Sequence, residues 1–148
     1  MAISCSLATV ADSISKLSIS GITIRDIDAL ATSWLALPNV LYPKPDGYVS
    51  NITVTPTDLG RGGYELRYTL TYRYLFTQLG NDAVLFAGYA TFMANLVLII
   101  NSIITNHTLT GAIDLTLGGV SVGPLQDPAG NMYHGADIQI NVLEFLTA

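Results

Sequence analysis

Charge is scarce in this chain of 148 residues. Only 11% of its residues are charged, whereas an ordinary soluble domain carries about 25%. The six Lys and Arg residues are scattered, and the net charge is −5. Without a basic cluster to neutralise phosphates, the sequence argues against direct nucleic-acid binding. Half of the residues are hydrophobic, which indicates either a surface covered by other protein or a neutral surface rich in Ser, Thr and Asn.

The sequence also has only one cysteine and no basic residue among its first 13 residues. The single Cys5 excludes an internal disulfide and a Cys-rich metal site, and it is compatible with assembly in a reducing cytoplasm. The opening MAISCSLATVADS has no basic residues, and polar residues interrupt its apolar positions, so it does not predict a secretory signal. A chain of this length fits one domain, residues 1–148.

The sequence contains one match to the nucleophile elbow G-x-S-x-G, at 119–123, with Ser121 at its centre. That motif requires a strand that turns sharply into a helix and lifts the serine hydroxyl. Here Gly123 and Pro124 lead into a predicted loop, and His134 follows only 13 residues after Ser121. We therefore interpret the match as coincidental.

Other candidate sites have equally plain interpretations. The glycine-rich segment 60–63 precedes a predicted strand instead of a helix, so it predicts a hairpin turn and not a phosphate loop. Asp127, His134 and Asp137 lie on or near a Gly/Pro loop, but nothing in their spacing fixes ligand geometry. His107 falls at a predicted helix end, where a cation suits the helix dipole. We predict no enzyme activity, no catalytic, cofactor-binding or metal-binding residues, and no cofactor.

What the sequence does have is a long alternating segment, YELRYTLTYRYLFT, at residues 64–77. A period of two predicts a strand with one packed face and one polar face. The packed face comprises Tyr64, Leu66, Tyr68, Leu70, Tyr72, Tyr74 and Phe76; the polar face comprises Glu65, Arg67, Thr69, Thr71, Arg73 and Thr77. Leu75 is the exception. The tyrosines at 64, 68, 72 and 74 fit either a core or a subunit interface, where Tyr is enriched.

Elements on both sides of this strand complete the prediction. Helical spacing of apolar residues predicts a helix at 3–18 and a shorter one from Asp26 to before Pro38. A turn-rich connection follows at 38–48, then strands at 49–57 and 64–78, a helix at 82–105, a strand from 113 to 122, a loop at 123–135 and a strand over 138–142. The order α(α)ββαββ predicts an α+β domain, in which helices pack on a mostly antiparallel sheet of about four strands.

The helix at 82–105 is apolar enough to raise the question of a membrane span, because no charged residue lies between Asp82 and Asp114. A polar stripe at Thr91, Asn95, Ser102 and Thr105, the absence of flanking Lys or Arg, and strands on both sides argue against it. We predict a core helix that also contacts a neighbouring subunit.

Taken in order, these elements resemble a known family. An amphipathic helix precedes LPNVLYPKPDGY, a hairpin ends in YELRYTLTYRYLF, a long helix follows, and the closing segment reads YHGADIQINVLEF. This arrangement resembles the tail terminator and related head-to-tail joining proteins of long-tailed bacteriophages. The resemblance covers most of the chain in order and character, and the closing segment is its most telling part.

The resemblance implies a structural virion protein of the tail and neck, assembled in the host cytoplasm. Such a subunit forms a homo-oligomeric ring, commonly a hexamer, that caps the tail tube. Its partners would be other copies of itself, the tail tube protein and a head-completion or connector protein. DNA would pass through the lumen without specific binding, and no membrane would be involved. The alternatives are another neck component, a small membrane-active protein using residues 83–100, and a hydrolase using Ser121.

Two substitutions express these expectations. If Gly135 adopts a positive φ, Gly135→Val damages folding or assembly. If the ring of Tyr72 is buried, Tyr72→Asp destabilises the domain by more than about 2 kcal/mol.

Overall fold

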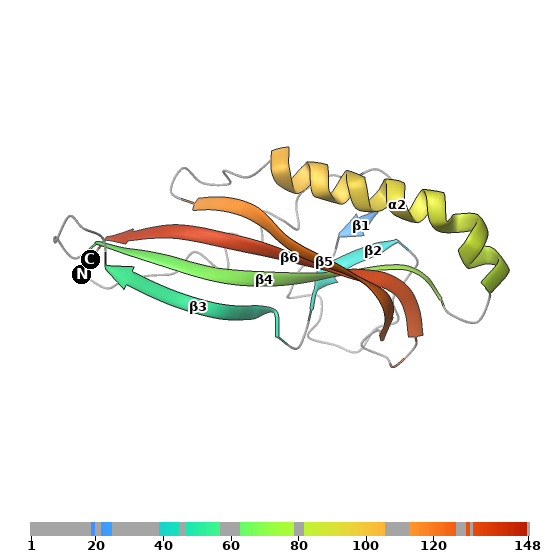
Figure 1. The fold of residues 1–148 in the computed structure, drawn as a ribbon, viewed down its shortest axis with the longest axis horizontal. Coiled ribbons are helices and arrows are strands. Elements are labelled where there is room, and N and C mark those ends of the chain that lie inside the picture. Colours follow the sequence, from blue (N-terminus) through green and yellow to red (C-terminus); the bar gives the residue numbers. More distant parts are fainter. Residues whose placement is uncertain are drawn as a thin grey trace.

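The computed structural model describes residues 19, 22–24, 39–44, 47–56, 63–78, 82–105, 113–126, 130 and 132–147. They form a six-stranded sheet and one long helix (Figure 1). The elements in chain order are β1 (Thr23–Ile24), β2 (Val40–Pro43), β3 (Val49–Pro56), β4 (Gly63–Gln78), α2 (Asp82–Thr105), β5 (Ile113–Gln126) and β6 (Met132–Thr147).

The predicted α+β class is wrong for the described residues, which are mainly sheet. Three strands of 16, 14 and 16 residues dominate the fold, and α2 is the one helix among the described elements. The helices predicted at 3–18 and from Asp26 lie outside the described residues. The prediction also underestimated the sheet itself, because β1 and β2 fall in segments that were expected to be turns or connections.

Two segments that were assigned to connections account for much of the difference between the predicted and the observed sheet. Residues 40–43 were assigned to a turn-rich connection, yet all four are buried in β2. The predicted loop at 123–135 is mostly strand, since β5 continues to Gln126 and β6 begins at Met132. By contrast, the strands expected at 49–57 and 64–78 and the helix at 82–105 are confirmed to within a residue.

β4 is the central strand of the sheet. Its neighbour on one side is β6, paired antiparallel along the whole length, and β5 continues the sheet beyond β6. On its other side β4 pairs with β2 at residues 72–75 and with β3 at residues 64–70. β1 adds a short parallel pairing to β2. In Figure 1 one end of β3, β4 and β6 extends past the end of α2, forming an arm of the sheet that the helix does not cover.

The alternation predicted for β4 is confirmed. Its even positions from Leu66 to Phe76 are buried in the main core with residues of α2, β5 and β6. The tyrosines at 68, 72 and 74 therefore belong to the core, while Tyr64 is half-buried. Leu75 breaks the pattern because the opposite face of the sheet is packed as well at this end. There Leu75 joins a second cluster with Val40, Tyr42 and Tyr133.

β4 and β6 approach each other closely at Gly135. A register shift between Leu75 and Thr77 places this glycine opposite a bulge in β4. A Cβ added at Gly135 would collide with the Tyr74 carbonyl oxygen and would lie 3.1 Å from the Tyr74 carbonyl carbon. The described glycines with positive φ are Gly47 and Gly130. Gly135 is not among them, so the condition stated for Gly135→Val is not met, and close backbone packing is the reason that this position needs glycine.

Candidate interaction surfaces

The serine motif does not form a nucleophile elbow. Ser121 is an exposed residue within β5, which continues as a strand through Gly123 and Pro124. Ser121 pairs with Asp137, while His134 pairs with Pro124. Because strand side chains alternate between faces, Asp137 and His134 lie on opposite faces of the sheet. A serine–histidine–aspartate arrangement is therefore not assembled from these three residues.

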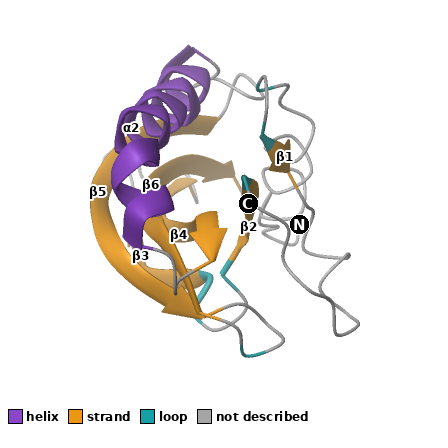
Figure 2. Cartoon of the chain, turned by 90° about the vertical axis from the view of Figure 1, so that its right-hand side faces the viewer, coloured by secondary structure: helices purple, strands orange, loops and turns teal. Residues whose placement is uncertain are grey.

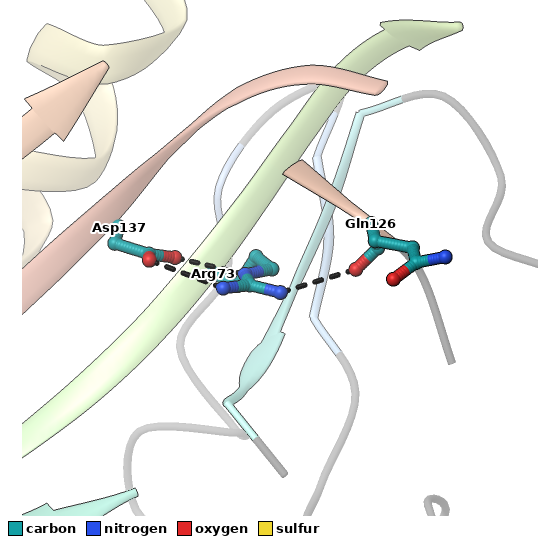
Figure 3. A network of polar contacts seen from close by, with 3 residues as sticks. All are labelled: Arg73, Gln126 and Asp137. Atoms are coloured by element: carbon teal, nitrogen blue, oxygen red, sulfur yellow. Dashed lines mark hydrogen bonds and ion pairs between the residues drawn. The ribbon is translucent and has the colours of Figure 1, made fainter. Parts of the chain in front are cut away.

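The carboxylate of Asp137 is occupied by an ion pair with Arg73 (Figure 3). Arg73 Nε donates to Asp137 Oδ1 at 2.9 Å and Nη2 donates to Oδ2 at 3.2 Å, while Nη1 donates to the Gln126 carbonyl oxygen at 3.1 Å. Burial alone would lower the pKa of Arg73, but the hydrogen bond and negative charge of Asp137 raise it overall. These contacts connect β4, β6 and the end of β5, so the Arg73 cluster has a structural role on this face.

The metal hypothesis gains no support from the part of the chain that the structure describes. Within it, no three His, Cys, Asp or Glu side chains come together. Asp137 is held by Arg73, and His134 is on the other face. Asp127 and His107 lie outside the described residues, as does the glycine-rich turn before Gly63, the first residue of β4.

His134 lies between the sheet and α2. It is 7% exposed, and its ring is 5.5 Å from that of Tyr89 and 4.9 Å from that of Phe92, both on the helix. Its Nε2 is buried and has no hydrogen-bond partner. Burial in this apolar setting lowers the pKa of His134 below 6.5. A neutral imidazole is therefore part of the contact between helix and sheet.

We expect acid to weaken the fold through His134. Because the folded state has the lower pKa, its stabilising contribution is complete above pH 6.5 and declines as the pH falls from 6.5 towards the folded-state value. The urea midpoint should fall between pH 7.5 and pH 5 more in the wild type than in His134→Leu, which cannot titrate at this position. An equal fall in both proteins would contradict this assignment, since carboxylate protonation is common to them.

A partly buried polar cluster attaches α2 to the sheet. Tyr74 Oη donates to Asn39 Oδ1 at 2.7 Å, and Asn95 Nδ2 donates to Tyr74 Oη at 2.9 Å and to Asn39 Oδ1 at 3.2 Å. Burial raises the pKa of Tyr74 to about 12, although the Asn95 hydrogen bond acts in the opposite direction. Asn95 therefore points to the sheet, whereas Thr91 and Thr105 are exposed. The residues of the predicted polar stripe therefore differ in their surroundings, from contact with the sheet at Asn95 to exposure at Thr91 and Thr105.

The outer face of α2 is apolar and exposed. One side of the helix packs into the core through Phe92, Leu96, Ile99 and Ile103. On the remaining surface, five large hydrophobic residues are between 38% and 54% exposed: Tyr89, Met93, Val97, Leu98 and Ile104. No residue between Asp82 and Asp114 is charged. The expectation that the sheet covers the apolar side of this helix is therefore only half right.

By length and composition, α2 contains a segment able to cross a membrane, Gly88–Thr105. Only 22% of that segment is buried. A helix in the centre of a soluble protein would be mostly buried, so this exposure requires an explanation. An exposed apolar patch on a protein surface is typical of a contact with another protein or with lipid.

A second exposed surface lies on β3, at the edge of the sheet. Every residue from Asn51 to Pro56 is exposed, including Ile52 at 61% and Val54 at 57%. β3 pairs with β4 on one side, and no strand of the described fold pairs with its other side. A bulge between Ser50 and Thr53 contains Asn51 with a φ of 54°. Beyond the bulge, β3 is a regular edge strand without a charged residue.

A polar hollow of about 300 Å³ lies on the arm, between Asn51, Arg67, Asp114 and Asn141. Its Arg67 side chain is 60% exposed and is 3.4 Å from the carboxylate of the neighbouring Glu65. Thr69 donates to Asn141 within it, at 2.9 Å. Exposed and already paired groups of this kind do not define a ligand site.

Comparison with protein-family models and with curated proteins finds no match to this chain. The surfaces just described are therefore the main structural evidence about function. Sequence reasoning identified α2 as a possible subunit contact but missed the exposed edge at β3. The signal was present in VSNITVTP, an extended and β-branched segment without charge.

Proposed function

We propose that this protein is a self-associating structural subunit, and that its outer α2 face is part of the contact between copies. The observation that carries the proposal is the row of exposed apolar residues on α2, which has no charge along its length. Burying such a row against another copy removes apolar surface from water at no cost in charge desolvation. The hydrogen bond from Asn95 on α2 to Tyr74 on β4 fixes the orientation of this row relative to the sheet.

Within that class, we propose a tail terminator of a long-tailed bacteriophage. The support is the sequence resemblance, from LPNVLYPKPDGY to YHGADIQINVLEF. The ring would cap the tail tube, contact a head-completion or connector protein and let DNA pass. The α+β fold that the resemblance implies adds no support, because α2 is the one helix among the described elements. Another neck component remains the nearest alternative.

The first test is the mass of the purified full chain in solution without detergent. Light scattering should give a discrete multiple of the chain mass, and electron microscopy should show rings. Particles produced without this chain should carry tails of uncontrolled length that do not join heads. A monomer at tens of micromolar, or normal particles in its absence, would overturn the proposal.

Replacing the apolar face of α2 with polar residues should prevent assembly. Met93 and Val97 are 54% and 48% exposed, so Met93→Gln with Val97→Gln should leave the fold intact while removing the buried contact. We expect at least about a tenfold weaker association, corresponding to 1.4 kcal/mol. Asn101→Gln, on an exposed and already polar position of the same helix, is the matched control. Rings of unchanged stability in the double variant would count against the α2 contact.

A membrane-active protein is the second candidate, because Gly88–Thr105 satisfies the length and composition of a span and is mostly unburied. The two candidates differ in how the wild type behaves with lipid. Flotation with neutral phosphatidylcholine vesicles that Met93→Gln/Val97→Gln abolishes would favour the membrane role. Rings that remain in the aqueous fraction would favour self-association.

A further inference from the structure

Two edge strands of the described sheet, β3 and β5, have matching chemistry. Within the described fold β3 pairs only with β4 and β5 pairs only with β6, while the short β1 forms a third edge beyond β2. In β5 the residues from Gly118 to Val122 are all exposed, with Val120 at 38% and Val122 at 51%. Neither β3 nor the part of β5 from Gly118 to Gln126 contains a charged residue. Natural edge strands are commonly protected by charge, proline or a bulge. β3 and this part of β5 each contain a bulge and a proline, but neither has a charge that would oppose pairing with another strand.

The match extends to the two faces of the sheet. Val54 pairs with Leu66, and Val120 and Val122 pair with Ile138 and Ala136, so all three valines share the face of the main core. The residues next to these valines lie on the opposite face. Thr53, beside Val54, pairs with Arg67, and Ser121, between Val120 and Val122, pairs with Asp137. If one edge meets the other with the faces aligned, valine meets valine and hydroxyl meets hydroxyl.

Strand direction is also compatible with joining one edge to the other. β3 runs antiparallel to β4, β4 to β6, and β6 to β5. The four strands therefore alternate in direction across the sheet. A second copy in the same orientation presents its β3 antiparallel to the first copy's β5. The same contact can then repeat from copy to copy, as a ring requires of a heterologous interface.

We propose that copies of this chain join head to tail by antiparallel pairing of β3 in one copy with residues 118–125 of β5 in the next. This inference rests on the proposed self-association and specifies a second contact for it. The partner is an uncharged extended strand of another copy, recognised by backbone hydrogen bonds and by valine contacts on one face. Because neither segment is charged, the pairing buries no unpaired charge.

A charge-exchange experiment on the full chain tests the pairing. Val54→Lys and Val122→Glu should each weaken assembly at least about tenfold by placing a charge in the joint. The double variant Val54→Lys/Val122→Glu should recover at least half of that loss, since opposite charges across strands attract, directly opposite or diagonally. Val54→Lys/Val122→Lys is the matched control and should not recover. Gln139→Lys, at an exposed position on the interior strand β6, should assemble as the wild type does.

The outcomes separate this inference from the proposed function. Wild-type rings with normal assembly of both single variants would overturn the strand pairing and leave self-association standing. If Val54→Lys weakens assembly and Val122→Glu does not, the head-to-tail arrangement is overturned in favour of a symmetric contact between β3 strands. Loss in both single variants without recovery in the Lys/Glu variant would also overturn it. A wild type that is monomeric throughout would overturn the proposed function itself. Unchanged thermal melting of each variant monomer shows that the fold is intact.

Discussion

Replacing Gly135 with alanine should destabilise the domain by about 3 kcal/mol, among the largest effects of any single methyl group in this fold. The new Cβ would collide with the Tyr74 carbonyl oxygen and would lie 3.2 Å from the Cα of Leu75. Both atoms are backbone, so no side chain can rotate to relieve the collision. The strands must separate locally, which weakens the β4–β6 ladder and the packing of Tyr74. A denaturation curve in guanidinium chloride measures the loss.

Gly123 provides a matched control, because it pairs directly with Gly135 across the β5–β6 ladder. A Cβ at Gly123 would have no other atom within 4 Å. Gly123→Ala should therefore change the free energy of unfolding by no more than about 0.5 kcal/mol in either direction. Similar midpoints for Gly123→Ala and Gly135→Ala would show that β4 and β6 are not in close contact at this point.

Tyr72→Asp should cost about 4 kcal/mol, since it removes a buried aromatic ring and introduces a carboxylate. Tyr72 is 1% exposed. Its ring meets that of Tyr48 edge to face with centroids 5.4 Å apart, and the two hydroxyls are hydrogen-bonded at 2.8 Å. Tyr48 immediately precedes β3, so the substitution should also loosen the start of the edge strand. Urea denaturation followed by far-UV circular dichroism would report both effects.

Tyr72→Phe separates the ring from the hydroxyl. It keeps the aromatic packing and loses one hydrogen bond, which typically contributes about 1 kcal/mol. We therefore expect a small decrease in stability for Tyr72→Phe and a large one for Tyr72→Asp. If the aspartate variant unfolds at the wild-type midpoint, Tyr72 cannot be a core residue.

Elements with strong local periodicity could be predicted from the sequence. The alternation from Tyr64 to Thr77 fixed both the extent of β4 and its buried face. Asp82 at the start and the long uncharged run that follows defined α2. In β4 one face is buried from Leu66 to Phe76, so the residue pattern directly reflects the packing.

β2, which is buried on both faces, and the last residues of β5 could not be predicted in this way. β2 has four consecutive buried residues and therefore no alternation, and its flanking prolines suggested a turn. β5 contains glycines at 118, 119 and 123 and a proline at 124, which are typical of loops. They are tolerated because β5 is an edge strand with a bulge between Leu117 and Val120.

The alternation of side chains along β6 also explains why a charged residue is buried and a neighbouring aromatic residue is exposed near the end of this strand. Glu144 is 2% exposed, whereas the adjacent Phe145 is 53% exposed. Ile138, Ile140 and Val142 set the buried side of β6, and Glu144 continues that series. The polarity of each residue alone would predict an exposed Glu144 and a buried Phe145. The exposed faces of α2 and β3 were hidden for a related reason, because an apolar residue in a sequence does not show whether its own chain covers it.

The second hydrophobic cluster, around Leu75 and Tyr133, gives the molecule unequal thickness. Where that cluster and α2 lie on opposite faces of β4, both faces of the sheet are packed. Towards β3 and the start of β4 the helix no longer covers it (Figure 1), and the sheet is curved when it is viewed end on (Figure 2). An end that is packed on both faces resists bending, while an end with fewer packed side chains can change its curvature at little energetic cost. In an assembly, the end of the sheet under α2 would keep the same shape in every copy, while the end at β3 and the start of β4 would adjust to the protein that it contacts.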